Sequence, residues 1–147
     1  DQSNNFQLEH FQNKIKEFVK KPLLDCNILL WGLSFKPQTD DVRESRAINL
    51  IKLMSKQVKG FYLYDPVAIQ NSKRELSTFS NLYFLDNKYS KIKNCDFLII
   101  CTEWREFWDP DIKQLKKLKE RKIFDGRNIL DKQTILDANI EYYGIGR

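Results

Sequence analysis

Short apolar runs alternate with amphipathic segments along most of the chain. Runs rich in aliphatic and aromatic residues, typical of strands, lie at residues 28–31, 61–64, 83–85, 97–101, 123–124 and 140–143. Apolar residues at helical spacing lie between them, at residues 47–54, 88–93, 111–119 and 131–138. This alternation predicts an α/β fold of the Rossmann-like type, with a doubly wound, mostly parallel sheet and helices on both faces.

Several local signals sharpen these elements. Phe6 to Lys20 predicts an amphipathic helix that ends before Pro22. Ser45 is positioned to cap the helix after the first strand, and Gly60 is expected to mark the exit from that helix. Phe97 to Cys101 is the most apolar run, which predicts a central strand buried on both faces. Residues 71–80 are too polar and Ser-rich to assign.

Polar residues follow most of the predicted strands. The loop from Gly32 to Ser45 carries two basic residues, Lys36 and Arg43, and the paired acids Asp40 and Asp41. Similar clusters end the later strands: Asp65-Pro66, Thr102-Glu103-Trp104, Asp125-Gly126-Arg127-Asn128 and Gly144-Ile145-Gly146-Arg147. Ligands of open α/β sheets bind outside the carboxyl ends of the strands, so parallel strands would gather these clusters at one edge. A phosphorylated ligand suits the basic residues, whereas ordinary βα turns would also explain several clusters, Asp65-Pro66 above all.

Six short motifs in these loops together resemble the C-terminal, UDP-binding domain of the UDP-glucose/GDP-mannose dehydrogenase family. They are Phe35-Lys36-Pro37, Thr39-Asp40-Asp41, Arg43-Glu44-Ser45, Thr102-Glu103-Trp104, Asp125-Gly126-Arg127-Asn128 and Tyr143-Gly144-Ile145-Gly146-Arg147. The resemblance runs from about Ile28 to Arg147, and the Thr-Glu-Trp and Asp-Gly-Arg-Asn forms are most similar to those of UDP-glucose 6-dehydrogenases. It implies an enzyme of polysaccharide biosynthesis that oxidises the sugar C6 hydroxyl to a carboxylate in two NAD-dependent steps. It also implies a UDP-sugar substrate and a homo-oligomer, at least a dimer.

The resemblance implies roles for four residues. Phe35 and Lys36 match the family's substrate-contacting pair, and Arg127 matches the arginine that contacts the nucleotide end of the substrate. Arg43 matches the arginine that reaches the NAD dinucleotide, where a guanidinium can make two hydrogen bonds to pyrophosphate. A structural ion pair is the alternative for each of the three basic residues, for instance between Arg43 and an acid of its own loop such as Asp41.

Two parts of a complete dehydrogenase are missing. No Gly-x-Gly-x-x-Gly follows a first strand, and none of Cys26, Cys95 and Cys101 matches the family's catalytic cysteine, so all three are expected to be small buried hydrophobes. We therefore expect residues 1–25 to be a connecting helix from a preceding part and residues 26–147 to be the nucleotide-sugar-binding domain. The chain alone is expected to hold no catalytic residue and to be inactive, with NAD bound mainly by the preceding part. The alternative is a free-standing nucleotide or nucleotide-sugar binding module.

Composition disfavours other classes. The 147 residues carry a formal net charge of +5, but the lysines are interleaved with apolar residues at helical spacing, as on the solvated faces of helices. No nucleic-acid-binding motif is present, and one His with three scattered Cys supplies no metal site. No apolar run approaches the ~20 residues of a membrane-spanning helix. Without a disulfide framework the natural setting is a reducing cytoplasm.

Three further features favour structural roles. Asp40 and Asp41 precede a predicted helix, where acids are favoured by capping and the helix dipole rather than needed for proton transfer. The aromatic residues of the segment 104–108 suit packing at a domain or subunit contact better than a platform for a base. His10 is expected to be a surface residue remote from every strand end.

Overall fold

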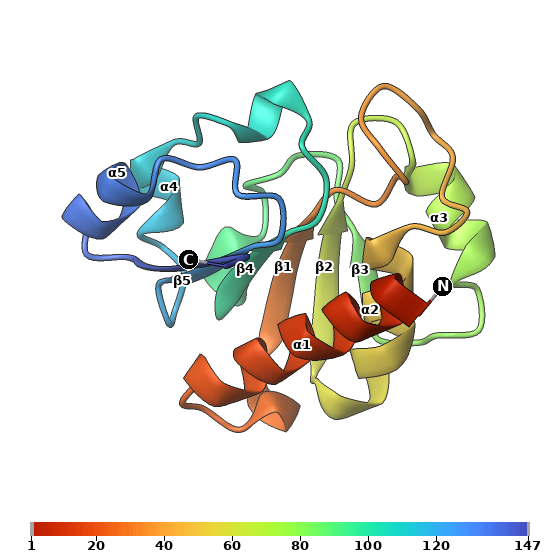
Figure 1. Cartoon of the computed structure of the whole chain (residues 1–147), viewed down its shortest axis with the longest axis horizontal. Helices are drawn as coiled ribbons and strands as arrows, with labels where there is room; N and C mark the ends of the chain where they lie inside the picture. Colours follow the sequence, from red (N-terminus) through yellow and green to blue (C-terminus); the bar gives the residue numbers. More distant parts are fainter. Residues whose placement is uncertain (1, 147) are drawn as a thin grey trace.

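The computed structural model describes residues 2–146, with side chains from residue 7 onward, and its centre is one six-stranded sheet (Figure 1). All strand pairs are parallel, and the spatial order is β3-β2-β1-β4-β5-β6. The strands are β1 (Asn27–Trp31), β2 (Gly60–Tyr64), β3 (Leu82–Phe84), β4 (Phe97–Ile100), β5 (Lys122–Asp125) and β6 (Glu141–Gly144). The order reverses between β1 and β4, so the predicted doubly wound parallel sheet is confirmed.

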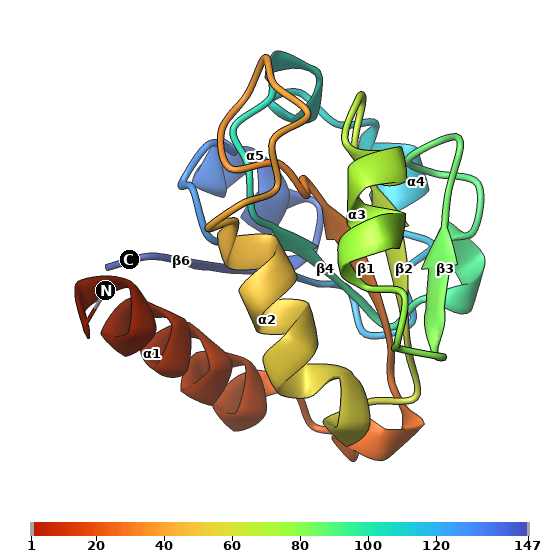
Figure 2. The same ribbon diagram turned by 90° about the vertical axis from the view of Figure 1, so that its right-hand side faces the viewer.

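Helices cover both faces of this sheet (Figure 2). They are α1 (Gln2–Phe18), α2 (Arg46–Met54), α3 (Ile69–Glu75), α4 (Ile112–Leu115) and α5 (Lys132–Asp137), with short 3-10 turns at residues 23–25, 55–57, 92–94 and 105–107. One core cluster joins α1 and α2 to one face of the sheet, and a second cluster packs the segments of α4 and α5 on the other. Among the described residues, no helix is long and apolar enough to cross a membrane.

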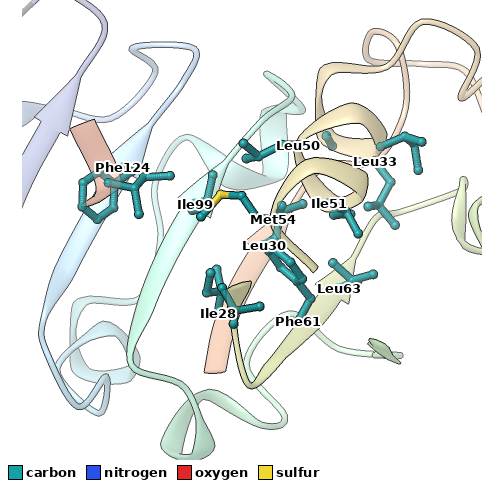
Figure 3. Close-up of a cluster of buried hydrophobic side chains, with 14 of the residues drawn as sticks. Ile28, Leu30, Leu33, Leu50, Ile51, Met54, Phe61, Leu63, Ile99 and Phe124 are labelled. Carbon is teal, nitrogen blue, oxygen red and sulfur yellow. The ribbon is translucent and has the colours of Figure 1, made fainter. Parts of the chain in front are cut away.

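Strand alternation divides the core between the two faces. Along β1, Ile28 and Leu30 belong to the first cluster, whereas Leu29 and Trp31 belong to the second. Figure 3 shows the first cluster, in which Ile51 and Met54 of α2 lie over side chains of the sheet. All four residues of β4 are buried, as expected for the central strand.

The start of α2 also follows the prediction. The Ser45 side chain accepts a hydrogen bond from the backbone N–H of Ile48 at 3.2 Å, so it is the N-cap. Gly60 is not the exit signal of this helix, because α2 ends at Met54 and Gly60 is the first residue of β2. The unassigned polar segment holds α3, and the element predicted at residues 111–119 is helical only over α4.

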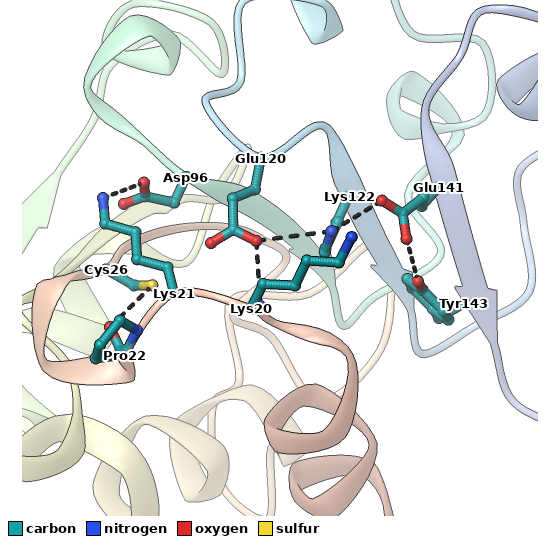
Figure 4. Close-up of polar contacts among 9 residues, drawn as sticks. All are labelled: Lys20, Lys21, Pro22, Cys26, Asp96, Glu120, Lys122, Glu141 and Tyr143. Carbon is teal, nitrogen blue, oxygen red and sulfur yellow. Dashed lines mark hydrogen bonds and ion pairs between the residues drawn. The ribbon is translucent and has the colours of Figure 1, made fainter.

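Polar contacts fasten the end of α1 and the residues after it to the amino-terminal edge of the sheet (Figure 4). Lys21 Nζ lies 2.8 Å from the buried carboxylate of Asp96, and the backbone N–H of Lys20 donates to Glu120 at 3.4 Å. Glu120 also faces Lys122, which is only 3% exposed. The expectation that the lysines of this region are solvated is therefore wrong for Lys122.

The C-terminal half of α1 also lies against β6. The Phe18 ring stacks on Tyr143 with centroids 4.4 Å apart, and Lys14 Nζ donates to the Gly144 carbonyl at 2.5 Å. These contacts lay the first turns of α1 beside the carboxyl ends of the strands, which is where the polar clusters gather.

Candidate functional site

A buried carboxylate organises the loop after β1. Asp65, which is 2% exposed, accepts hydrogen bonds from the backbone N–H groups of Leu33 and Ser34 at 2.7 and 3.2 Å. Its other oxygen accepts from Val67 and Ala68 at the start of the next turn. Asp65 therefore serves the structure of two turns, as the alternative reading of Asp65-Pro66 holds.

A second buried carboxylate organises the loop after β5. Asp125 is fully buried and accepts from the backbone N–H groups of Arg127, Ile129 and Leu130 and from the Tyr142 hydroxyl, at 2.8–3.1 Å. These bonds curl the chain so that the Arg127 side chain starts at the very end of the strand. In the sequence, Asp65 and Asp125 resemble ordinary exposed turn residues. Their burial, which only the fold reveals, sets them apart from such residues.

The loop after β1 is tied to the loop after β4. The Ser34 carbonyl accepts from the Thr102 hydroxyl, and its Oγ accepts from the Trp104 indole, both at 3.3 Å. The same Oγ donates to the Lys36 carbonyl at 2.8 Å. Phe35 and Lys36 are thus held at the carboxyl edge of the sheet with exposed side chains, and the Phe35 side chain is 53% exposed.

Arg127 joins the loop after β5 to this group. Its Nη2 lies 2.5 Å from Glu103 Oε2, and both side chains are about one-third exposed. Arg127 Nε is buried and has no hydrogen-bond partner within the described part of the chain. The loop that carries Lys36 is thus bonded to Trp104, whose neighbour in sequence, Glu103, holds Arg127.

Arg43, the fourth predicted residue, is tied to Phe35 through Asp41, whose backbone carbonyl accepts from the Phe35 N–H at 2.7 Å. Its guanidinium makes two hydrogen bonds to Asp41, at 3.0 and 2.9 Å, and the Arg43 side chain is 88% exposed. These bonds hold the pKa of Asp41 down at about 2. Asp41 thus pairs with Arg43 and leaves the capping of α2 to Ser45, and the predicted alternative of a structural ion pair is realised in the geometry.

A cavity of about 310 Å³ opens beside Arg127. The N-terminal turns of α1, the start of α2 and the loops after β4, β5 and β6 enclose it; the lining residues are Gln7, Leu8, His10, Phe11, Arg46, Leu50, Cys101, Gly126, Arg127, Asn128 and Ile145. Phe35, Lys36 and Arg43 do not line it. His10 is exposed as expected, but it is not remote from the strand ends, because α1 crosses the face of the sheet toward them.

The cysteines show no sign of reactivity. Cys26 and Cys95 are buried, and burial raises the pKa of each thiol to about 12. Cys101, also expected to be buried, is partly exposed where it lines the cavity, but desolvation still raises its pKa to about 12. A thiol with such a pKa stays protonated at neutral pH and is a poor nucleophile. Residues 2–146 contain no group of His, Cys, Asp and Glu that could hold a metal ion.

The aromatic residues near Glu103 divide into two kinds. Trp104 and Phe107 are buried in the core of this chain, with 8% and 0% exposure, and so are not free for the expected contact with another domain or subunit. Trp108 is 45% exposed and lies under the Arg105 guanidinium at 4.6 Å from its ring centroid. Trp108 alone of the three remains available for a contact.

Comparison with known proteins identifies the domain. Residues 29–132 match the model of the UDP-glucose/GDP-mannose dehydrogenase family, UDP binding domain. Arg147, the last residue of the motifs that resemble this family, lies outside the described residues.

Relatives match over nearly the whole chain. A UDP-glucose 6-dehydrogenase of Rickettsia conorii is 34% identical over 98% of the chain, and an uncharacterised protein of Methanocaldococcus jannaschii is 40% identical over the same share. The chain spans 33% of the first of these proteins and 17% of the second. It is thus no more than a third as long as either.

Solved structures share the fold. A UDP-D-ManNAc dehydrogenase from Pyrococcus horikoshii matches with a TM-score of 0.73 and 23% identity, covering 98% of this chain and 31% of that one. An NDP-N-acetyl-D-galactosaminuronic acid dehydrogenase from Methanosarcina mazei matches with a TM-score of 0.75 and 18% identity, covering 95% of this chain and 28% of that one.

Proposed function

We propose that this chain, which belongs to the UDP-glucose/GDP-mannose dehydrogenase family, is the nucleotide-sugar-binding part of an NAD-dependent UDP-glucose 6-dehydrogenase. The reaction would oxidise the sugar C6 hydroxyl to a carboxylate. Residues 26–147 would hold the UDP-sugar, and residues 1–25 would connect them to a preceding part that binds NAD and supplies the catalytic cysteine. The assembled enzyme would be a homo-oligomer, at least a dimer.

The observation that carries this proposal is the placement of Arg127. Its guanidinium stands at the carboxyl end of β5, beside a cavity large enough for a small ligand, and its Nε is buried without a partner in the described structure. An unsatisfied buried N–H is costly, so a ligand oxygen that accepts from it would be favoured. Charge and geometry thus suit an acidic group such as the phosphates of UDP.

The other predicted residues take complementary roles. Lys36, on the exposed part of the loop after β1, would place its ammonium against a phosphate or sugar oxygen, and Phe35 would pack over the substrate. Arg43 would reach the NAD pyrophosphate when its pair with Asp41 opens toward the cofactor. The exposure of these three side chains at one edge of the sheet supports a site completed by another part of the enzyme.

Calorimetric titration of this chain with UDP and with UDP-glucose tests the proposal. UDP should bind, and Arg127→Ala should reduce its binding free energy by about 1.5 to 3 kcal/mol, the range for a hydrogen bond to a charged group. Arg121→Ala is the matched control, because Arg121 is an exposed arginine at the opposite edge of the sheet. An unmodified chain that binds neither ligand would contradict the proposal.

A turnover assay tests the division of labour. With UDP-glucose and NAD, the pure chain should form no NADH, since the dinucleotide fingerprint and the catalytic cysteine are absent from its sequence. NADH formation by protein of verified mass would show that the chain is catalytically complete. UDP binding in a protein whose native reading frame adds no NAD-binding part would instead favour a free-standing binding module.

A further inference from the structure

A second arginine faces the cavity of Arg127. Arg46 is the first residue of α2 and lies outside the motifs that resemble the family. It lines the cavity and is exposed. Within the described part of the chain its side chain makes no hydrogen bond or ion pair, unlike those of Arg43 and Arg127, which each hold a carboxylate.

The guanidinium groups of Arg46 and Arg127 both lie near the Cys101 sulfur. Arg127 and Arg46 both work to lower the pKa of the Cys101 thiol, against the larger effect of burial. None of the described residues that line the cavity is an Asp or a Glu. Glu103, which does not line the cavity, neutralises Arg127, whereas no carboxylate of the described side chains pairs with Arg46.

The remaining walls are largely apolar. Leu8 and Phe11 of α1, Leu50 of α2 and Ile145 after β6 line the cavity opposite or beside the arginines. A bare inorganic anion gains nothing from such walls, whereas a ligand with an acidic group and a flat or apolar body satisfies both kinds of surface.

We propose that Arg46 and Arg127 together hold one phosphoryl group of the nucleotide, with the nucleoside packed against the wall formed by α1. This deepens the proposed function and rests on it. It makes Arg46 a binding residue, and it gives α1 a part in the ligand site besides its part in connecting the domain. Two guanidiniums can share the non-bridging oxygens of one phosphoryl group through charge-assisted hydrogen bonds.

Calorimetry with UDP, UMP, uridine and inorganic pyrophosphate tests this assignment. Arg46→Ala should lower the affinity for UDP and UMP at least tenfold and change the affinity for uridine by less than twofold, because only the phosphorylated ligands contact the guanidinium. Lys52→Ala is the matched control, since it removes the same charge from the exposed side of the same helix. An equal loss for uridine, or no loss for UMP, would overturn the assignment.

A double-mutant cycle tests whether the two arginines share one group. If they do, Arg46→Ala combined with Arg127→Ala should cost clearly less than the product of the two separate fold-losses, because each single change already disrupts the shared contact. Fully multiplicative losses would assign the arginines to different groups and overturn the proposal. Unchanged amide NMR spectra of each variant would establish that the fold is intact.

Nitrogen-15 NMR of the arginine side chains separates this inference from the proposed function. UDP should shift the Nε–H signals of Arg46 and Arg127 together. If UDP binding depends on Arg127 while the Arg46 signal stays still, the proposed function stands and the shared site fails. If UDP does not bind but pyrophosphate shifts both signals, the proposed function fails and the paired-arginine anion site stands.

Discussion

Glu103 and Arg127 face each other across the carboxyl ends of β4 and β5, with 2.5 Å between Glu103 Oε2 and Arg127 Nη2. The pair orients the guanidinium while leaving about one-third of each side chain exposed. It also places a negative charge next to the proposed anion site, so any phosphate that binds Arg127 does so in the presence of a competing carboxylate.

Glu103→Gln should therefore strengthen UDP binding by about two- to fivefold, at the scale of a partly screened charge near a ligand. Glutamine keeps an oxygen that accepts from Arg127 but removes the repulsion of the ligand. Calorimetry at low ionic strength would measure the gain. Glu106→Gln is the control, because Glu106 pairs with Lys88 and Tyr64 instead. Weaker UDP binding in Glu103→Gln would mean that orientation by the full carboxylate outweighs the repulsion.

The loop after β1 depends on the absence of a side chain at Gly32. Gly32 has φ of 97°, and a Cβ placed on it would stand 2.4 Å from Thr102 Oγ1 and 2.7 Å from Thr102 N. We expect Gly32→Ala to destabilise the chain by about 3 kcal/mol or more, since strain and backbone overlap add. Gly146→Ala tests the strain alone, because Gly146 has φ of 70° with nothing within 4 Å of a Cβ, and should cost about 1 kcal/mol. Urea unfolding of both variants measures the difference, and equal losses would exclude the overlap.

The strands can be predicted from the sequence because each is a short, mostly apolar run. A run such as Phe97 to Ile100 has no polar position that could face water, and its central place in a parallel sheet follows from that. Parallel pairing alone brings the polar clusters to the carboxyl edge of the sheet, so the position of Arg127 at that edge is predictable from the sequence.

The features missed by the sequence depend on contacts between distant segments. The direction in which α1 crosses the sheet brings His10 to the cavity, and no local pattern encodes that direction. Lys122 reads as one more surface lysine until β6 brings Glu141 beside it. No sequence pattern singles out Arg46, which lines the cavity together with residues of α1.

Lys122→Ala should destabilise the chain by about 2 to 3 kcal/mol at pH 7. The change leaves Glu120, whose side chain is 14% exposed, without the cation that it faces at 3.6 Å. The expected destabilisation is smaller than the roughly 3–5 kcal/mol for breaking a fully buried ion pair, because the other partner of Lys122, Glu141, is half-exposed. Lys52→Ala, which removes an exposed pair with Glu75, should cost no more than about 0.5 kcal/mol. Similar losses for the two lysines in urea unfolding would show that burial of Lys122 has no energetic weight.

The same variant has a defined pH dependence. The hydrogen bond from Lys122 lowers the pKa of Glu141 from its ordinary value of 4.5. A lowered carboxyl pKa in the folded state contributes stability that is complete above 4.5 and is lost as the pH falls through the folded-state pKa. The difference in unfolding free energy between the unmodified chain and Lys122→Ala should thus narrow below pH 4.5. If the difference in unfolding free energy stayed constant below pH 4.5, the destabilisation would come from contacts other than the pair with Glu141.

Arg43 allows the structural and functional roles of one residue to be separated. Its two hydrogen bonds hold the pKa of Asp41 at about 2, so Arg43→Ala should return that pKa toward the ordinary 3.8, as carboxyl-carbon NMR would measure. The depressed pKa stabilises the fold above pH 3.8, and the stabilisation is lost as the pH falls through about 2. Both side chains reach solvent, so the melting temperature at pH 7 should change little.

In the longer enzyme that we propose, Arg43→Ala should weaken NAD and leave UDP-glucose affinity nearly unchanged. Lys36→Ala should show the reverse, with a loss for UDP-glucose of about 1.5 to 3 kcal/mol. The two residues lie seven positions apart in one loop, and only Arg43 holds an acid of that loop, so one small phosphate is not expected to meet both. Separate titrations of each variant with the two ligands make the comparison. Normal NAD affinity in Arg43→Ala would leave Arg43 with no role beyond its pair with Asp41.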